Sequence, residues 1–185
     1  MPTNAGFDPV APLLLRRCAE GELDSILEIV NAAAEAYRRF VPDDRWHDPY
    51  MSASELDREL RSGVVFWCAE RCGEIVGVMG LQPVLDVELI RHAYVRPQRQ
   101  GTGVGGALLD DLVARARKPL LVGTWADATW AIRFYERHGF RLEEDPARRV
   151  ALLRRYWDVP DAQIAASVVM ELPVSAAAAT RRDED

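Results

Sequence analysis

The stretch YVRPQRQGTGVGGALLDDL, residues 94–112, decides the fold of this chain. It places four glycines, Gly101, Gly103, Gly105 and Gly106, between an apolar run and an amphipathic one. Glycine loses more backbone entropy on ordering than any other residue, so a cluster at a helix start indicates positive φ angles or close approach of a ligand to the backbone. The stretch therefore predicts a strand, a ligand-holding loop and a helix.

Outward from the glycines, apolar spacing and turn residues divide the chain into alternating helices and strands. Ser52 or Ser54 is expected to cap one of the helices. The predicted order contains strands at 13–19, 64–71, 74–85, 86–95, 120–125, 139–144 and 167–172, and helices at 21–40, 52–63, 106–117, 128–138 and 147–157. This mixture predicts an α/β (α+β) fold, in which helices pack on the faces of a sheet.

Length and composition set the limits of function. The chain has 185 residues, of which 49% are hydrophobic, which suits one domain at 13–173 with tails at 1–12 and 174–185. A net charge of −6 argues against nucleic acid as a partner, and no apolar run is long enough to span a membrane. The start of the chain does not resemble a signal peptide, so a cytoplasmic location is expected.

The cysteines predict neither a disulfide framework nor a metal site. Cys18, Cys68 and Cys72 are odd in number and form no paired CxxC motifs. The sequence therefore favours three reduced thiols and no bound metal.

The glycine loop can be compared with two known nucleotide-binding loops and with a loop that holds no ligand. Gly101, Gly103 and Gly106 satisfy the dinucleotide pattern GxGxxG, but RPQRQ separates them from the strand, and Asp127, the nearest carboxylate at the required distance, is better placed to cap the next helix. A P-loop needs a lysine that is missing here. A flexible turn without a ligand is the plain alternative.

Two motifs resemble those of the GCN5-related N-acetyltransferases, the GNAT superfamily. Gln100-x-x-Gly103-x-Gly105 matches the family pattern [RQ]-x-x-G-x-[GA], and AIRFYERHGF at 131–140 is similar to its A-x-x-F-Y-x-x-x-G-F signature. The resemblance covers nearly the whole chain apart from the tails. It implies a mixed, largely antiparallel sheet of about six to seven strands with helices on both faces.

The resemblance further implies that acetyl-CoA is the cosubstrate and that its pyrophosphate lies on the glycine loop. Free N–H groups and the dipole at a helix start attract such an anion. Ala128 stands where many members have an asparagine that contacts the pantetheine arm, which puts that contact in doubt. The implied cofactor-binding residues are Tyr94, Val95, Arg96, Arg99, Gln100, Gly101, Thr102, Gly103, Val104, Gly105, Gly106, Trp125, Ala131 and Phe134, with Arg133 and Arg137 able to offset charge.

Direct attack of an amine on the thioester needs a base and an acid. The resemblance places Tyr135 as the general acid that protonates the leaving thiolate, and a backbone N–H near Tyr94 and Val95 as the donor to the oxyanion. Glu88, at the start of the strand that leads to the loop, is the first candidate for the base. Asp86, His92 or a water chain are the alternatives.

The acceptor is left open as a small-molecule or peptide amine. The loop FVPDDRWHDPYM at 40–51 combines Asp43, Asp44 and Asp48 with Trp46 and Tyr50, which suits a cationic or aromatic amine, or else an ordinary solvated loop. The segment 147–172 is expected to close the site or to form a homodimer face. A noncatalytic acyl-CoA sensor and a dinucleotide-dependent oxidoreductase are the competing functions.

Overall fold

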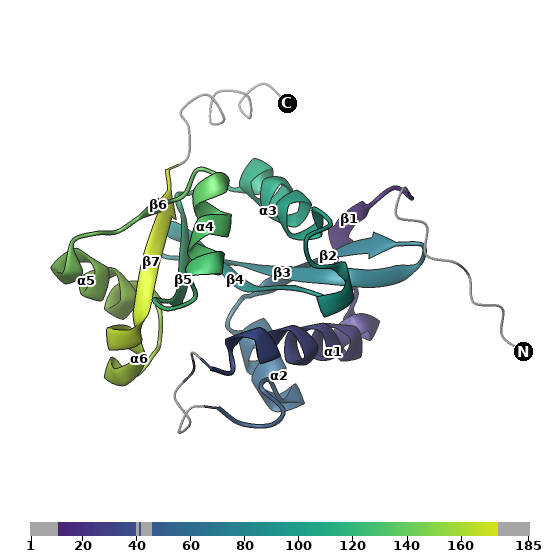
Figure 1. The fold of residues 1–185 in the computed structure, drawn as a ribbon, viewed down its shortest axis with the longest axis horizontal. Helices are drawn as coiled ribbons and strands as arrows, with labels where there is room; N and C mark the ends of the chain where they lie inside the picture. Colours follow the sequence, from purple (N-terminus) through teal and green to yellow (C-terminus); the bar gives the residue numbers. More distant parts are fainter. Residues whose placement is uncertain (1–10, 40, 42–45, 174–185) are drawn as a thin grey trace, which may run out of the picture.

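The computed structural model describes residues 11–39, 41 and 46–173 (Figure 1). Of the two predicted tails, only residues 11 and 12 belong to the described part of the chain. Asp43 and Asp44 lie outside it. The helices are α1 (Leu23–Ala34), α2 (Ala53–Arg61), α3 (Val104–Arg115), α4 (Thr129–Arg137), α5 (Pro146–Tyr156) and α6 (Asp161–Ala166), with 3-10 turns η1 (Glu20–Glu22), η2 (Glu35–Tyr37) and η3 (Pro97–Arg99). The strands are β1 (Leu14–Arg17), β2 (Val65–Arg71), β3 (Glu74–Val84), β4 (Val87–Val95), β5 (Leu120–Trp125), β6 (Arg141–Leu142) and β7 (Ser167–Leu172).

Seven strands form one sheet in the order β1-β2-β3-β4-β5-β7-β6. All neighbours are antiparallel except β4 and β5, which α3 connects as a parallel crossover. Helices α3 and α4 lie on one face of the sheet, and α1 and α2 lie on the other (Figure 1). The mixed, largely antiparallel sheet with helices on both faces is confirmed.

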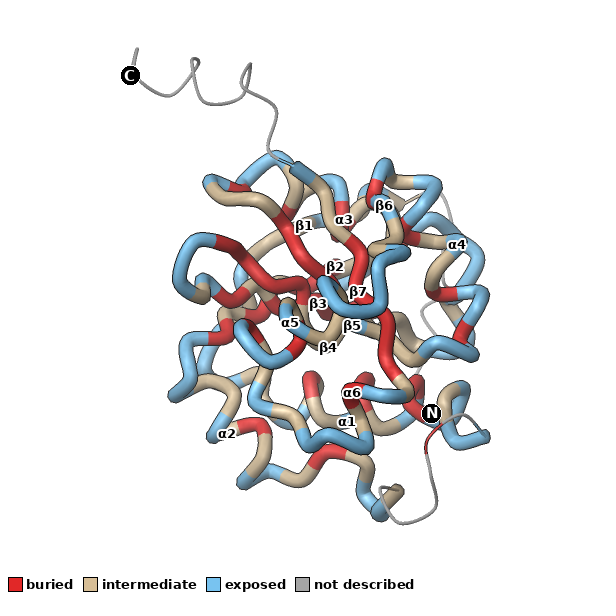
Figure 2. The backbone as a smooth tube through the Cα atoms, turned by 90° about the vertical axis from the view of Figure 1, so that its left-hand side faces the viewer, coloured by how far each residue is buried: buried red, intermediate tan, exposed pale blue. Residues whose placement is uncertain are grey.

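The core forms because successive strand residues point to opposite faces. On β5, Leu120 and Val122 join the cluster under α3, whereas Leu121 joins a second cluster with Leu153 of α5. A third cluster packs α1 and α2 against β2 and β3. The buried backbone accordingly follows the central strands, while exposed segments occupy connections and outer helix faces (Figure 2).

The structure confirms the predicted cap of α2 and differs from the sequence analysis at three other places. Ser52 caps α2, since its hydroxyl accepts a hydrogen bond from the Glu55 N–H. Helix α6 was missed, because six residues with one buried side chain give no helical periodicity. The predicted strand at 139–144 pairs only at 141–142. Asp127 does not cap α4, whose N-cap is Ala128 without a side-chain hydrogen bond.

Among the described residues, none of the helices is long and apolar enough to cross a membrane.

A charged network fastens β1 to η1. The guanidinium of Arg16 donates to both carboxylate oxygens of Glu22, at 2.6 and 2.8 Å, and to Glu70 at 2.6 Å. The Ala19 N–H donates to Glu22 at 2.7 Å. The hydrogen bonds from Arg16 and then from Ala19 lower the pKa of Glu22 to about 2.

This network predicts an acid-labile contribution to stability. A carboxylate with a depressed native pKa stabilises the fold above its unfolded pKa of about 4.3 and loses that contribution as pH falls through the native value. The difference in free energy of unfolding between wild type and Glu22→Gln is therefore expected to be full above about pH 5 and to fade toward pH 2. Urea titrations at several pH values measure it. Glu20→Gln, an exposed change in the same turn, is the control, and a pH-independent difference contradicts the prediction.

Candidate active site

The site begins where β4 and β5 separate. The two strands pair only from Glu88 to Ile90 against Leu120 to Val122. On its other side β4 has a bulge, because Val78 faces Tyr94 and Gly80 faces Arg91, which leaves two residues opposite one. His92 in the bulge has a φ of 49°. The bulge in β4 and the separation of β4 from β5 together open the sheet in its middle.

The glycine loop stands at the end of β4. Gly101 and Gly103 have φ values of 74° and 84°, the left-handed region that glycine adopts without steric cost. Gly103 is the N-cap of α3 and has no side chain to cap it, so the N–H groups of the first turn are left to a ligand or solvent. An ideal Cβ on Gly106 would lie 3.0 Å from Nε2 of His138, so this glycine lets α3 and α4 approach each other.

A cavity of about 500 Å³ runs from this loop between α3 and α4 to the opening in the sheet. Most of the predicted cofactor residues line it, together with Tyr135. Its lining comprises Ala33, Tyr37, Met79, Ala93, Tyr94, Val95, Arg99, Gln100, Gly101, Gly103, Gly105, Gly106, Trp130, Ala131, Phe134, Tyr135, Arg137 and His138.

Four predicted cofactor residues do not line this cavity. Arg96 donates to Glu28 of α1 at 2.6 Å and to the Ile75 carbonyl at 2.7 Å, so it ties α1 to the sheet. The Thr102 hydroxyl donates to the Arg99 carbonyl at 2.7 Å and holds the loop itself. Val104 is buried in the core, and Trp125 lines a second cavity. Side-chain direction, which sequence spacing does not give, separates these residues from the rest.

The second cavity, of about 200 Å³, occupies the gap between β4 and β5 on the side of α1. It shares Tyr37, Ala93, Tyr94 and Tyr135 with the first, so the two cavities meet at these residues. Its other lining residues are Tyr50, Ile90, Arg91, His92, Val122, Gly123, Thr124, Trp125, Leu153, Trp157, Val159, Gln163 and Ser167. A cosubstrate in the first cavity and an acceptor in the second would thus meet in the opening of the sheet.

Tyrosine hydroxyls gather at this junction. Burial is the main reason why the pKa values of Tyr37, Tyr50, Tyr94 and Tyr135 all lie above that of free tyrosine. For Tyr135 the charge interaction with Tyr37 adds to burial, and for Tyr94 the interactions with Tyr50 and Tyr37 do so. These phenols stay protonated at neutral pH, so they can donate protons but cannot serve as bases.

The structure does not bring Glu88 to Tyr135. Its carboxylate accepts hydrogen bonds from the N–H groups of Arg117 and Lys118, at 2.8 and 3.3 Å, and holds the start of β5. Glu88 lines neither cavity, and it lies at the end of β4 opposite to the loop. This geometry does not support the prediction of Glu88 as the base, because the start of β4 lies within the part that pairs with β5 and not at the opening of the sheet.

Of the two alternative side chains, one lies at the site. Asp86 is in the turn before β4, where it accepts hydrogen bonds from Arg155 and Tyr156. His92 lines the second cavity, stacks on Phe66 with ring centroids 5.6 Å apart, and has Nε2 3.3 Å from Oε2 of Glu59.

Glu59 of α2 lies beside His92. Burial tends to raise the pKa of Glu59, but its interactions with His92 and Arg91 outweigh that effect and leave the pKa below its usual value. Arg91 donates to both carboxylate oxygens at 2.9 Å. Glu59 is therefore ionised at neutral pH, and its carboxylate lies beside the His92 ring.

Sequence reasoning missed several residues of the site. Tyr37 of η2 lines both cavities, and its ring contacts Trp130 at a centroid distance of 4.9 Å. Tyr37 and Trp130 both stand on amphipathic helical segments. In such segments, packing in the core explains an aromatic residue as well as a place in a binding site does. Of the loop at 40–51, Tyr50 lines the second cavity, and the tilted ring of Trp46 contacts Tyr50 at a centroid distance of 5.2 Å.

The late segment helps to close the second cavity. Leu153, Trp157, Val159, Gln163 and Ser167, from α5 to the start of β7, line the second cavity. Of the two roles expected for 147–172, the structure thus supports closure of the site, and a homodimer face stays a prediction. Among the residues that the structure describes, no Asp or Glu side chain lines the second cavity.

Comparisons with known proteins agree with this architecture. Residues 62–142 match the family described as acetyltransferase (GNAT) domain. The fold is similar to that of a PaiA N-acetyltransferase from Thermoplasma acidophilum in complex with coenzyme A, with a TM-score of 0.66, 16% identity, and coverage of 88% of this chain and 99% of that one. No curated protein matches the chain in sequence.

Two further solved structures share the fold. The ribosomal-protein-S18-alanine N-acetyltransferase of Escherichia coli has a TM-score of 0.61 at 20% identity, over 89% of this chain and 95% of that one. A GNAT family acetyltransferase from Elizabethkingia anophelis with acetyl-CoA bound has a TM-score of 0.59 at 20% identity, over 87% of this chain and 97% of that one. Residues 62–142 thus match a GNAT acetyltransferase domain, and the chain has the fold of solved GNAT acetyltransferases.

Proposed function

We propose that this protein is an acetyl-CoA-dependent N-acetyltransferase that transfers the acetyl group directly to a primary amine in a ternary complex. One observation carries the proposal: the cavity that starts at the glycine loop meets the second cavity at Tyr135 and Tyr94, in the opening between β4 and β5. A thioester that enters from one side and an amine that enters from the other meet there without a covalent acyl-enzyme. The coenzyme A and acetyl-CoA complexes of the fold neighbours support the choice of cosubstrate.

The glycine loop would hold the pyrophosphate of the cosubstrate. The first-turn N–H groups of α3 face the cavity at Gly105 and Gly106, and the helix dipole adds partial positive charge. Arg99 and Arg137 line the same cavity and offset the charge of the phosphates. The acyl arm would then pass Phe134 and Ala131 toward Tyr135.

The chemical step needs proton transfers at both ends. A lysine-like amine has a pKa near 10.4, so its neutral form costs roughly 4–5 kcal/mol at pH 7. Among the described side chains that line the second cavity, the imidazole of His92 can accept a proton, and it replaces Glu88 as the proposed base, directly or through water. Backbone N–H groups near Tyr94 and Val95 would stabilise the oxyanion, and Tyr135 would protonate the leaving thiolate.

The aromatic walls of the second cavity favour an amine with an apolar or aromatic body over one with a second positive charge. Tyr37, Tyr50, Trp125 and Trp157 supply these walls. Arg91 lies among them and disfavours additional cationic groups, although its pairing with Glu59 reduces that effect.

Two measurements test the proposed function. Acetyl-CoA and CoA are expected to raise the thermal midpoint of the full chain, because a ligand that binds only the folded state stabilises it, whereas NAD, NADPH and ATP are not. A panel of amines with apolar or aromatic bodies is then tested for thiol release. Stabilisation by NAD or NADPH alone would favour the oxidoreductase, and tight acetyl-CoA binding without thiol release from any amine would favour a sensor.

The role of His92 is tested with His92→Asn. Asparagine tolerates the positive φ of this position but takes up no proton near neutrality, so the bulge is kept and the base is lost. We expect kcat/KM to fall roughly 10- to 100-fold. A variant with the wild-type kcat/KM would exclude His92 from proton transfer.

A further inference from the structure

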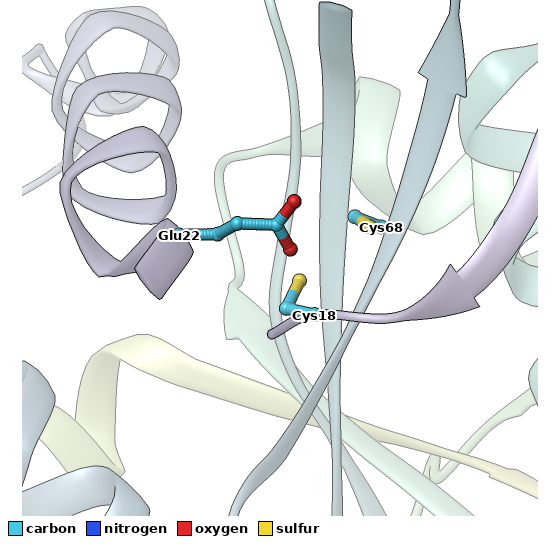
Figure 3. Close-up of side chains that lie close together, drawn as sticks. All are labelled: Cys18, Glu22 and Cys68. Carbon is cyan, nitrogen blue, oxygen red and sulfur yellow. The ribbon is translucent and has the colours of Figure 1, made fainter. Parts of the chain in front are cut away.

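A second cluster of reactive groups lies away from the proposed active site, beside the first strand. The sulfur atoms of Cys18 and Cys68 and a carboxylate oxygen of Glu22 all lie within 4.8 Å of one another (Figure 3). Neither cysteine lines either cavity of the site. The two residues are 50 positions apart in the sequence, so strand pairing alone brings them together.

The register of β1 and β2 places both thiols on the same face. Arg16 stands opposite Cys68, and the Cys18 N–H donates to the Phe66 carbonyl at 2.9 Å, which continues the pairing beyond the end of β1. Cys18 and Cys68 are thus diagonal neighbours on one side of a two-strand ladder, an arrangement in which side chains can touch. Cys18 belongs to the short connection between β1 and η1, where its side chain can turn more freely than one inside a strand.

A bound metal ion does not suit this cluster. Both oxygens of Glu22 already accept hydrogen bonds from Arg16, and the Ala19 N–H donates to one of them. A divalent cation would have to displace the guanidinium and would still have three protein ligands, one fewer than structural zinc sites use. The same positive charge favours a thiolate, which is the reactive form of cysteine.

We propose that Cys18 and Cys68 are a redox-active dithiol that a peroxide converts into a reversible intramolecular disulfide. One sulfur, as its thiolate, attacks a peroxide oxygen, the O–O bond breaks, and a sulfenic acid and hydroxide form. The second sulfur then attacks the sulfenic sulfur, the S–S bond forms, and the S–O bond breaks with release of a second hydroxide. The hydroxides take up the two thiol protons, so two thiols and hydrogen peroxide give a disulfide and two waters.

The electrostatics of the pair agree with this reaction. The hydrogen bond from the Cys18 thiol is the main cause that lowers the pKa of Cys68, and the charge of Arg16 adds to it against the effect of burial. The same hydrogen bond, with burial, raises the pKa of Cys18. Of the two sulfurs, that of Cys68 is therefore the one that ionises more readily. Cys68 is fully buried and Cys18 is half-buried, so a small oxidant reaches the pair past Cys18.

The third cysteine provides a matched control. Cys72 is exposed in the turn between β2 and β3. Cleavage after Arg61 and Arg71 places the three cysteines on three different tryptic peptides, so each possible disulfide gives a distinct pair of linked peptides.

The experiment treats the full chain with hydrogen peroxide, quenches it, and alkylates the remaining thiols under denaturing conditions. Mass spectrometry is expected to find the monomer lighter by two hydrogen atoms, with the peptide of Cys18 linked to that of Cys68 and with Cys72 alkylated. Dithiothreitol should reverse the linkage. Cys72→Ser should retain it, and Cys18→Ser, a change at a half-buried position, should abolish it.

Three outcomes would overturn the proposal. The first is the absence of a Cys18–Cys68 linkage under conditions that oxidise Cys72. The second is a linkage of Cys68 to Cys72 in wild type in place of the expected pair. The third is stoichiometric zinc binding, measured by titration with zinc chloride alone, that Cys18→Ser abolishes, because the cluster would then be a metal site.

Discussion

Tyr135→Phe is expected to lower kcat of acetyl transfer by roughly 10²-fold while the Kd for acetyl-CoA changes less than about threefold. The hydroxyl lies at the junction of the two cavities, and burial keeps it protonated at neutral pH. Without it the leaving thiolate takes its proton from solvent. Phenylalanine preserves the ring, which contacts Phe134 and Phe140 at centroid distances of 5.1 and 5.5 Å, so the core should survive.

Tyr156→Phe is the matched control. The Tyr156 hydroxyl donates to Asp86 at 2.9 Å, and the residue lines neither cavity. This variant loses one hydroxyl from a largely buried ring but should retain wild-type kcat. Steady-state kinetics give kcat, and isothermal titration gives the Kd for acetyl-CoA. Equal kcat values for Tyr135→Phe and the control would remove Tyr135 from the mechanism, and a parallel loss of acetyl-CoA affinity would make it a binding residue.

Gly103→Glu should weaken CoA binding by at least about 100-fold, which corresponds to about 2.7 kcal/mol. Nothing lies within 4 Å of an ideal Cβ on Gly103, so the new side chain fits into open space at the start of α3. Its carboxylate stands where the pyrophosphate is proposed to lie, and like charges at that range repel by several kcal/mol at an effective dielectric constant of about 20.

Backbone strain has to be separated from this repulsion. Gly103 has a φ of 84°, so any side chain there costs about 1–2 kcal/mol of stability. Gly73, in the turn between β2 and β3, has a φ of 78° and equally open surroundings. Gly73→Glu should therefore lower the thermal midpoint by a similar amount and leave the Kd for CoA unchanged. Similar affinities in the two variants would show that the glycine loop does not bind the cosubstrate.

Part of the site could be read from local sequence because the physical cause is itself local. Glycines that need positive φ, and a helix start without a capping side chain, are properties of a few consecutive residues, so the glycine loop at 100–106 could be predicted directly. Tyr135 was placed in the site by the resemblance of residues 131–140 to a family signature. Arg96 and Thr102 belong to the same stretch, yet they face away from the cavity, because hydrogen bonds to Glu28 and to the Arg99 carbonyl fix their directions.

The proposed base is a feature that local sequence did not predict. Glu88 and His92 stand on the same strand, and the sequence favoured Glu88. The parallel pairing with β5 ends at Ile90, so Glu88 lies inside the paired region and His92 lies in the opening. The point at which two strands separate depends on the β3–β4 bulge and on helices from both ends of the chain, and no short window of sequence encodes it.

The sequence by itself determined the sheet-and-helix class, the glycine loop and the two motifs, because periodicity, capping and backbone freedom act between near neighbours. Only the tertiary structure decided which residues face the cavities, that Tyr37 and α5 help to line the second cavity, and that Cys18 lies beside Cys68. Those contacts join residues far apart in the chain. They are fixed by strand register and by the packing of helices on the sheet, which are properties of the folded chain as a whole.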